Sequence, residues 1–403
     1  MKTIIIGAGQ AGLALSYHLT QKAHQHLVLE QSSHPGSAWS ARWDSFTFVT
    51  PNFMTELPGL KLPGDPNSYL ARDQILAYFD QYVRTFDLPV RFEVQVISVE
   101  PTPRGYQVDT ADGSSLEASN VVIATGLFQR PKIPAFGGRL PAEIAQLHST
   151  HYRRPEALPA GSVLVVGSGQ SGCQIAEELY QSGRRVYLAV SAMGRVPRRY
   201  RGYDCFYWAD KIGMLDRTPE MLPSPKMKFA GNPQVSGAKG GHNLNLHQFA
   251  RDGVTLLGRA QDTHNGKLIL APNLHETLAN TDRAELSFIK AVDAYIEKQG
   301  LNLPPESVPQ LRDGLDQPQI LELDLADAGI SVVIWATGFA YDYSLVKLPV
   351  TDGDGFPVSK RGVTDYPGLY FLGMPYLYKQ RSGLVGGVGE DADYLAQHIT
   401  AHP

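Results

Sequence analysis

Cysteine is nearly absent from the sequence, occurring only as Cys173 and Cys205, which form no C-x-x-C pair. A disulfide framework and a dithiol redox centre are therefore excluded. Free cysteines are ordinary in a reducing compartment, so we expect a cytoplasmic protein. The 12 histidines are scattered, and none has ligand spacing with cysteine or carboxylate residues, so we predict no metal site.

Long apolar runs and an excess of one charge are missing too. No segment approaches the roughly 18 apolar residues of a membrane span. The opening run Ile4–Ile6 stops at Gly7, short of the about 7 apolar residues that a secretory signal needs. Lys and Arg number 36 against 40 Asp and Glu, for a net charge of −4. We therefore expect no membrane or nucleic-acid partner.

Glycine, by contrast, follows a pattern. At 403 residues the chain exceeds what one core usually serves, so two domains are expected. An apolar strand, a G-x-G-x-x-G turn and a helical segment occur twice, first after Thr3–Ile6 and again after Val163–Val166. Such a unit binds a dinucleotide pyrophosphate at the N-terminus of its helix. The repetition predicts two nucleotide-binding domains.

The first unit contains Gly7, Gly9 and Gly12, with Gln10 inside the turn. The first glycine permits the tight turn, the second lets the backbone approach a pyrophosphate, and the third allows close packing of helix against strand. Glu30 ends the next apolar strand, at about the 20-residue spacing where a carboxylate binds ribose hydroxyls. Strand, glycines, helix, strand and acid in this order predict a dinucleotide site.

The second unit differs at its strand end. Its turn comprises Gly167, Gly169, Gln170, Ser171 and Gly172. Ser191 follows the next strand where an acid would stand, and arginines come after it, including Arg195 and Arg198. An acid repels the 2′-phosphate of NADPH and arginine holds it, so we predict NADPH over NADH, with Ser191 as a further donor. A solvated basic loop is the alternative, and the sequence does not select the arginine.

An Ala-Thr-Gly sequence also occurs twice, each time after an apolar strand. We predict that Thr125 and Gly126 of the first copy and Gly338 of the second line cofactor sites. The repeats place an outer domain at about 1–155 and 325–403 and an inner domain at about 156–324. An irregular excursion at about 200–285 is expected to shape the substrate approach or a subunit interface, which is compatible with a homodimer.

Local patterns predict several further elements. Asp73–Phe86 has the apolar spacing of an amphipathic helix, and Gln95–Val99 and Tyr106–Thr110 are typical of strands. Asn265-Gly266 is typical of a hairpin turn, here between residues 254–257 and 267–270. A helix is expected from about Asp282 to Gln299, ended by Gly300.

Two segments indicate a flavin, so we predict FAD as the first cofactor. The tail has a strand that ends at Gly373, then a glycine-rich stretch that includes Gly387, and then a helix. The N-terminus of this helix could face an isoalloxazine and stabilise its anionic reduced form. The other segment contains Trp39 and Trp43 and could cover a flavin face, although both residues could equally belong to the core.

With these motifs together, the chain resembles the class B flavin-containing monooxygenases. The similarity is greatest to a bacterial branch related to plant indole-pyruvate monooxygenases, often labelled as flavoproteins of potassium transport. It covers nearly the whole chain and rests on the two glycine turns, the Ala-Thr-Gly sequences, Thr50-Pro51 and residues 147–152. It implies an α/β fold with two Rossmann-like dinucleotide-binding domains, a glutathione-reductase-type FAD domain with an inserted NADPH domain.

The resemblance also implies a mechanism. NADPH reduces FAD, NADP⁺ stays bound, and O2 adds at flavin carbon C4a. The C4a-(hydro)peroxyflavin then oxygenates a small nitrogen, sulfur or keto-acid substrate, while the protein orients the cofactor and excludes water. A family residue near the position of Asn52 lies by this oxygen site, so Asn52 is carried over as the catalytic residue.

The family linker is not fully kept. Its pattern F-x-G-x-x-x-H-x-x-x-(Y/F) retains His148 and Tyr152 but has Ala142 and Ile144 in place of Phe and Gly. The ketone-oxygenating version has Trp where Tyr152 stands, which argues against ketone oxygenation here.

Two other functions stay open. A flavin reductase or NADPH oxidase would pass electrons to a quinone or O2 without inserting oxygen. A nucleotide-sensing regulatory flavoprotein would bind both cofactors and turn over slowly. The paired units support FAD and NADPH, whereas oxygenation rests on the resemblance alone, because one fold hosts many functions.

Overall fold

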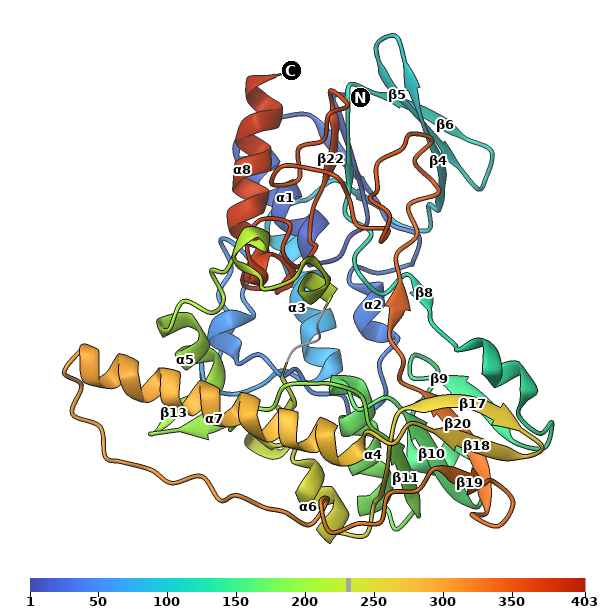
Figure 1. Cartoon of the computed structure of the whole chain (residues 1–403). Helices are drawn as coiled ribbons and strands as arrows, with labels where there is room; N and C mark the ends of the chain where they lie inside the picture. The colour runs from blue at the N-terminus through green and yellow to red at the C-terminus, as the bar shows by residue number, and fades with distance from the viewer. Residues whose placement is uncertain (230–232, 403) are drawn as a thin grey trace.

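The structure, a computed structural model, describes residues 1–229 and 233–402; residues 230–232 of the predicted excursion and residue 403 lie outside the described residues. The described chain contains two five-stranded sheets together with small antiparallel ones. In Figure 1 one large sheet lies in the upper part of the molecule and the other at the lower right. Neighbouring strands of both large sheets run parallel, which confirms the α/β class.

The first sheet belongs to the N-terminal nucleotide fold. Its order is β22, β7, β1, β2, β3, spanning Leu369–Phe371, Asn120–Ile123, Thr3–Ile6, His26–Leu29 and Val90–Arg91. Helices α1 (Gln10–Gln21) and α8 (Val388–Ala401) lie side by side against one face. The antiparallel strands β4 (Val96–Thr102), β5 (Gly105–Thr110) and β6 (Ser115–Ala118) pack against the other. Cover on both faces explains why β1 and β7 are short runs of Ile and Val.

The second sheet belongs to the inserted fold. Its order is β16, β11, β10, β20, β9, spanning Thr255–Leu257, Val186–Ala189, Ser162–Val166, Ile330–Trp335 and Ala145–His148. Helix α4 (Gln170–Gln181) follows β10 and packs against β10 and β11. The sequence places β9 and β20 in the outer domain, but they pair with each other, and β20 also pairs with β10.

This pairing corrects the predicted domain boundaries of 1–155, 156–324 and 325–403. The chain crosses between the folds at a short antiparallel pair, β8 (Arg130–Pro131) and β21 (Phe339–Ala340). Figure 1 shows β8 between the two large sheets. The inserted domain therefore comprises the residues between β8 and β21. A short apolar strand carries no local signal for the sheet that it joins, because long-range pairing decides this.

Short elements build the excursion at 200–285. They are α5 (Cys205–Lys211), α6 (Leu246–Arg251), the pair β12 (Arg199–Tyr200) and β13 (Tyr203–Asp204), and the pair β14 (Val235–Ser236) and β15 (His242–Asn243). The Asn265-Gly266 turn joins β17 (Ala260–His264) to β18 (Lys267–Leu270), and β19 (Glu322–Asp324) adds to the same sheet. The prediction that residues 254–257 form the first strand of this hairpin is wrong, because residues 255–257 form β16, which pairs parallel with β11.

The helix predicted at Asp73–Phe86 is α3 (Arg72–Thr85). The helix predicted from Asp282 is α7 (Leu274–Lys298), which begins about two turns earlier. Its buried stripe includes Glu285, a charged residue that interrupts the apolar pattern in the sequence. This glutamate is buried within the helix because it forms an ion pair with Arg195.

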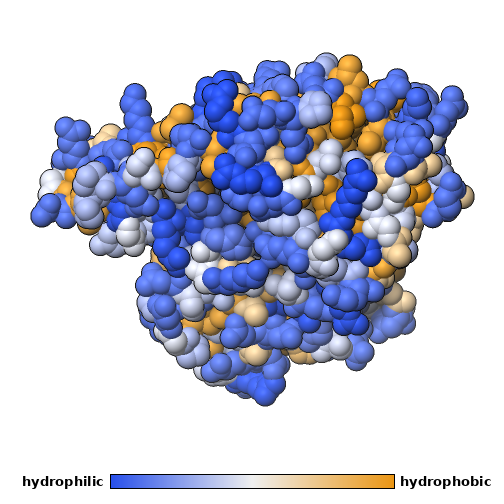
Figure 2. Space-filling view, turned by 90° about the horizontal axis from the view of Figure 1, so that it is seen from below, coloured by the Kyte–Doolittle hydropathy of each residue, from blue (hydrophilic) through white to orange (hydrophobic). Residues whose placement is uncertain are grey.

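Figure 2 shows the face of the molecule seen from below, where hydrophilic side chains predominate and hydrophobic residues lie in small groups among them. No described helix combines the length and the apolarity that crossing a membrane would require. Within residues 1–229 and 233–402, no three His, Cys, Asp or Glu side chains gather as they would around a metal ion.

Candidate functional site

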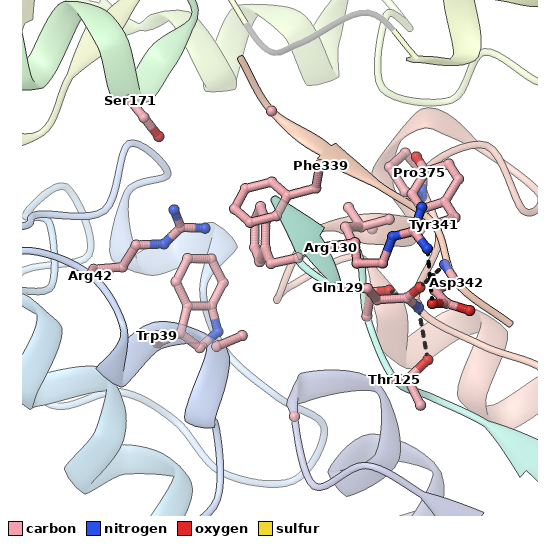
Figure 3. Close-up of a pocket in the computed structure, with 18 of the residues that line it drawn as sticks. Trp39, Arg42, Thr125, Gln129, Arg130, Ser171, Phe339, Tyr341, Asp342 and Pro375 are labelled. Carbon is pink, nitrogen blue, oxygen red and sulfur yellow. Dashed lines mark hydrogen bonds and ion pairs between the residues drawn. The ribbon is translucent and has the colours of Figure 1, made fainter. Parts of the chain in front are cut away.

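A cavity of about 1270 Å³ lies between the two large sheets and is lined by residues of both folds. The carboxyl ends of β1 and β10 open into it, which is where parallel sheets bind ligands. Figure 3 shows part of its wall. The wall includes the following predicted cofactor-binding residues: Gly7, Gly9, Gln10, Glu30, Trp39, Thr125, Gly126, Gly167, Gly169, Gln170, Ser171, Ser191, Gly338 and Gly373.

The glycine turn of the first fold leaves no room for side chains at two of its positions. Gly7 has a φ of 107°, and a Cβ on Gly12 would lie 1.9 Å from the carbonyl oxygen of Gly7. A Cβ on Gly9 would meet no protein atom within 4 Å, although Gly9 lines the cavity. Packing thus requires Gly12, whereas the space beside Gly9 is open to a pyrophosphate.

The turn of the second fold has the same geometry. Gly167 has a φ of 103°, a Cβ on Gly172 would lie 1.9 Å from the Gly167 carbonyl oxygen, and Gly169 again has open space. Helices α1 and α4 each begin directly after the open glycine, so their free N–H groups face this space. These two cradles fit two dinucleotides, FAD in the first fold and NADPH in the second.

Glu30 follows β2 and is only 4% exposed. Its Oε1 accepts hydrogen bonds from the backbone N–H and the hydroxyl of Ser32, at 3.0 and 2.8 Å, and from the hydroxyl of Ser37 in the short helix α2 (Ser37–Ser40). Its Oε2 accepts one from the backbone N–H of Ala8 at 2.8 Å. These bonds fix the carboxylate in the wall and leave acceptor capacity on Oε2 for a ribose hydroxyl.

A serine and an arginine occupy the corresponding corner of the second fold. The backbone N–H of Ser191 donates to the Ser168 hydroxyl at 2.9 Å. Ala189 of β11 pairs with Leu257 of β16, so Ser191 and Arg259 follow neighbouring parallel strands at equal distance. Both line the cavity, Arg259 is exposed, and no carboxylate pairs with Arg259 in the described chain. The sequence patterns did not indicate Arg259, because it lies on the third strand of the unit.

The structure does not bring Arg195 and Arg198 to the cavity, which corrects their predicted contact with a 2′-phosphate. Arg195 donates to Glu285 at 2.8 and 3.1 Å and to Asp282 at 2.8 Å. Arg198 donates to both carboxylate oxygens of Asp204, at 2.5 and 2.6 Å. Both arginines are at most 2% exposed. In a sequence, an arginine after a strand looks the same whether it serves a ligand or a distant carboxylate.

Two more predicted flavin residues lie outside the wall. Trp43 is 2% exposed and packs edge-on against Phe46 with ring centres 5.2 Å apart, so it belongs to the core. Gly387 is needed elsewhere, because a Cβ there would lie 2.0 Å from the carbonyl oxygen of Arg381. The glycines of the tail thus serve partly for close backbone packing.

Asn52, the residue carried over as catalytic, is buried behind the wall. Its Nδ2 donates to the carbonyl oxygen of Asp65 at 3.0 Å and to the hydroxyl of Ser68 at 2.7 Å. Thr50 lines the cavity and Asn52 does not. Asn52 therefore holds the loop that follows Thr50, and a direct oxygen contact has no support in this arrangement.

Arg42 is a wall residue that the sequence patterns did not indicate. Its side chain is buried, and burial lowers the pKa of the guanidinium to about 10, which still leaves it protonated at neutral pH. The guanidinium carbon lies 4.1 Å from the centre of the Phe128 ring. Figure 3 shows Arg42 and Trp39 reaching into the cavity from the segment at α2, and Phe339 from β21. Only the position of Arg42 in the tryptophan-rich segment could have indicated it.

His148 ends β9 and is buried beside the cavity wall. One ring nitrogen, Nε2, lies 3.1 Å from the carbonyl oxygen of Gly338, and the ring meets Phe339 edge-on at 4.9 Å. Burial, and to a smaller extent the charges of His151 and Arg42, lower the pKa of His148. The neutral imidazole of His148 therefore has a structural role, since it connects β9 to the second Ala-Thr-Gly turn at Gly338.

Both cysteines are buried. Burial raises the pKa of the Cys205 thiol to about 12 and that of Cys173 further still. Neither forms a thiolate near neutral pH, so neither is available for thiol–disulfide exchange.

Comparison with known proteins agrees with this geometry. A family model described as pyridine nucleotide-disulphide oxidoreductase matches residues 4–202. An "Uncharacterized oxidoreductase CzcO-like" of Geobacillus kaustophilus (strain HTA426) is 35% identical over 401 residues, which covers 99% of this chain and 98% of that protein. The indole-3-pyruvate monooxygenase YUCCA1 of Oryza sativa subsp. japonica is 30% identical over 207 residues, about half of either chain.

Solved structures confirm the expected fold. A variant of the flavin monooxygenase from Stenotrophomonas maltophilia has a TM-score of 0.68 at 21% identity and covers 99% of this chain and 98% of that one. Bacillithiol disulfide reductase Bdr from Bacillus cereus has a TM-score of 0.63 at 18% identity and covers 100% and 99%. The predicted fold class and the predicted pair of cofactors, FAD and NADPH, are confirmed.

Proposed function

The chain belongs to the class B flavin-containing monooxygenase-like family, and on this premise we propose that it is an NADPH-consuming monooxygenase of a small nitrogen, sulfur or keto-acid substrate. When bound, FAD would supply the redox and oxygen-transfer chemistry, with NADPH as the reductant, one atom of O2 going to the substrate and the other leaving as water. The protein holds and orients the reactants.

The single observation that carries this proposal is that both pyrophosphate cradles open into one cavity. Hydride transfer requires the nicotinamide and the flavin to approach within about 3–3.5 Å, which a shared cavity permits. Two separate nucleotide clefts would not.

Charged residues at opposite corners of the cavity set the orientation of the two nucleotides. Glu30 accepts hydrogen bonds from the ribose of FAD. Ser191 and Arg259 bind the 2′-phosphate of NADPH, because a guanidinium offers the paired donors that a phosphate accepts.

An aromatic wall excludes water from the reacting centre. It includes Phe46, Phe48, Phe128 and Phe339. Water exclusion preserves a reactive oxygen adduct until the substrate arrives. No histidine lines the described wall, and its two carboxylates already have partners, Glu30 with Ala8 and Ser32 and Asp342 with Ser344 and Arg130. This favours substrates that are nucleophilic themselves or, like keto acids, accept a nucleophile.

The deciding test is a stopped-flow experiment. The protein with bound FAD is reduced anaerobically with NADPH and then mixed with O2. A near-ultraviolet transient typical of an oxygen adduct at C4a, shortened by amines, sulfides or keto acids, is expected. Direct return to oxidised flavin with peroxide release, unchanged by these compounds, would replace the proposal with an NADPH oxidase.

A further inference from the structure

A buried cation without a protein partner lines the cofactor cavity. Arg42 is 4% exposed, and no carboxylate pairs with it in residues 1–229 and 233–402. Its Nε is buried without a hydrogen-bond acceptor in this part of the chain. Aromatic rings lie next to the guanidinium, with the ring centre of Phe128 at 4.1 Å and that of Trp39 at 5.8 Å. A buried charge of this kind is costly unless a ligand supplies the counter-charge.

The segment that carries Arg42 lies alongside helix α4 of the NADPH fold. Three residues further on, the hydroxyl of Ser45 donates to Glu178 of α4 at 2.7 Å. Trp43 and Gln174 share the wall of a small neighbouring pocket, and Gln174 also lines the main cavity. The hydrogen bond to Glu178 and the pocket wall shared with Gln174 place this segment of the FAD domain alongside the middle of α4.

Figure 3 shows the Arg42 guanidinium on the side of the cavity where Ser171 lies, above Trp39. Ser171 stands in the first turn of α4, next to the open space at Gly169. We propose that Arg42, a residue of the FAD domain, binds the pyrophosphate of NADPH seated at the N-terminus of α4. The contact would join the two domains around the nucleotide. The proposal needs NADPH binding but no oxygen transfer, so it stands or falls separately from the monooxygenase activity.

The FAD pyrophosphate is a weaker candidate for the same guanidinium. The FAD turn is already contacted by Trp39, whose Nε1 donates to Gln10 at 3.3 Å. Arg42 instead lies near β9 of the NADPH sheet, where its charge contributes to the low pKa of His148. The rings around the guanidinium belong to the FAD domain, but the guanidinium itself lies on the side of the cavity where Ser171 of the NADPH fold stands.

Equilibrium binding to the FAD-loaded protein tests the assignment. Arg42→Gln is expected to raise the dissociation constants of NADP⁺ and NAD⁺ by the same factor, about 10- to 100-fold, because both share the pyrophosphate. Binding of 2′-AMP, which lacks the pyrophosphate, and the FAD content of the protein should not change. Arg42→Lys should recover part of the NADP⁺ affinity, since it keeps the charge without the guanidinium fork.

Two controls separate this contact from general charge and folding effects. Arg154→Gln removes a charge from the adjacent surface, where Arg154 is 63% exposed, and should leave NADP⁺ affinity unchanged. Arg42→Met should melt no lower than the wild-type protein when NADP⁺ is absent, because it removes an unpaired buried charge. It should also lose the rise in melting temperature that NADP⁺ gives the wild-type protein.

Several results would overturn the assignment. If Arg42→Gln leaves NADP⁺ affinity unchanged and lowers the FAD content, the guanidinium binds the FAD pyrophosphate instead. If Arg42→Gln leaves the affinity for both cofactors unchanged, the guanidinium binds an anionic substrate instead. A parallel loss of 2′-AMP binding, or a lower melting temperature of Arg42→Met without nucleotide, would make Arg42 a structural residue.

Discussion

The two nucleotide folds of this protein have nearly the same backbone around their phosphate turns. The first glycine has a φ of 107° in one fold and 103° in the other, and the last glycine would place a Cβ 1.9 Å from a carbonyl oxygen in both. Gly126 and Gly338, which follow the neighbouring strands, also match, with φ values of 75° and 77°. The folds differ at the next strand end, where Glu30 stands in one and Ser191 beside Arg259 in the other.

The difference shows how one architecture binds two cofactors. Backbone N–H groups and helix ends recognise the pyrophosphate that both dinucleotides carry. In the proposed function, the side chain at the strand end would meet the part of the nucleotide that differs, namely a free ribose in FAD and a 2′-phosphate in NADPH. Selectivity therefore depends on a few side chains placed on an unselective backbone.

The largest effects are expected from substitutions that disrupt the phosphate turn of one fold at a time. Gly12→Val should abolish FAD retention, because the new side chain collides with the Gly7 carbonyl. Gly172→Val should keep a yellow protein that dithionite reduces and NADPH does not. Absorbance spectra of the purified variants measure both outcomes, with Gly138→Ala as a control, since its Cβ would meet no atom within 4 Å. Loss of FAD from Gly172→Val would show that the folds are not independent.

The next test concerns the arginines after the second strand. Arg195→Ala should lower the free energy of unfolding by about 3–5 kcal/mol, because Glu285 and Asp282 lose their buried partner. Denaturant unfolding measures this loss. The preference for NADPH over NADH should stay constant in whatever protein remains folded. A selective loss of NADPH binding at wild-type stability would restore the predicted phosphate role of Arg195.

A smaller and selective effect is expected at Arg259. Arg259→Ala should weaken NADPH by about 1.5–3 kcal/mol, roughly 10- to 150-fold, and leave NADH nearly unchanged. Anaerobic flavin reduction at varied NADPH and NADH concentrations measures both constants. The exposed Arg283→Ala is a matched control on the same domain. Equal weakening of both nucleotides would show that Arg259 does not read the 2′-phosphate.

The smallest effect is a pH dependence of opposite sign in the two folds. Burial lowers the pKa of His26 in the FAD fold, so its contribution to stability is present above about pH 6.5 and is lost as the pH falls. The hydrogen bond with Glu177 raises the pKa of His242 in the NADPH fold, so its contribution is present below that pH and is lost as the pH rises. Each amounts to roughly a few tenths of a kcal/mol up to about 1 kcal/mol.

Thermal unfolding between about pH 5 and pH 8 should resolve these contributions. His26→Gln should flatten the loss of stability on acidification, and His242→Gln should flatten the loss on alkalinisation. The same direction of change in both variants would contradict the assigned pKa shifts.

Local signals predicted much of the fold. The glycine turns, the amphipathic helix at α3 and the Asn265-Gly266 turn depend on neighbouring residues, and the structure has them at the expected places. The boundaries and the membership of β9 and β20 depend on pairing between distant strands, and here the prediction was wrong. Glu285 shows the same limit at one residue, since its burial follows from Arg195, ninety positions away.

The sequence by itself determined that two dinucleotides bind, because each phosphate turn is a local pattern whose glycines are required by backbone geometry. The spacing of Glu30 from its turn also predicted a residue that lines the cavity. Only the tertiary structure decided which cations face the cavity. Arg195 and Arg198 form ion pairs with buried carboxylates, whereas Arg42 and Arg259 line the cavity and have no carboxylate partner among the described residues. The physical reason is that a charge acts on what surrounds it in space, and those surroundings include residues far away in the chain, as Glu285 is from Arg195.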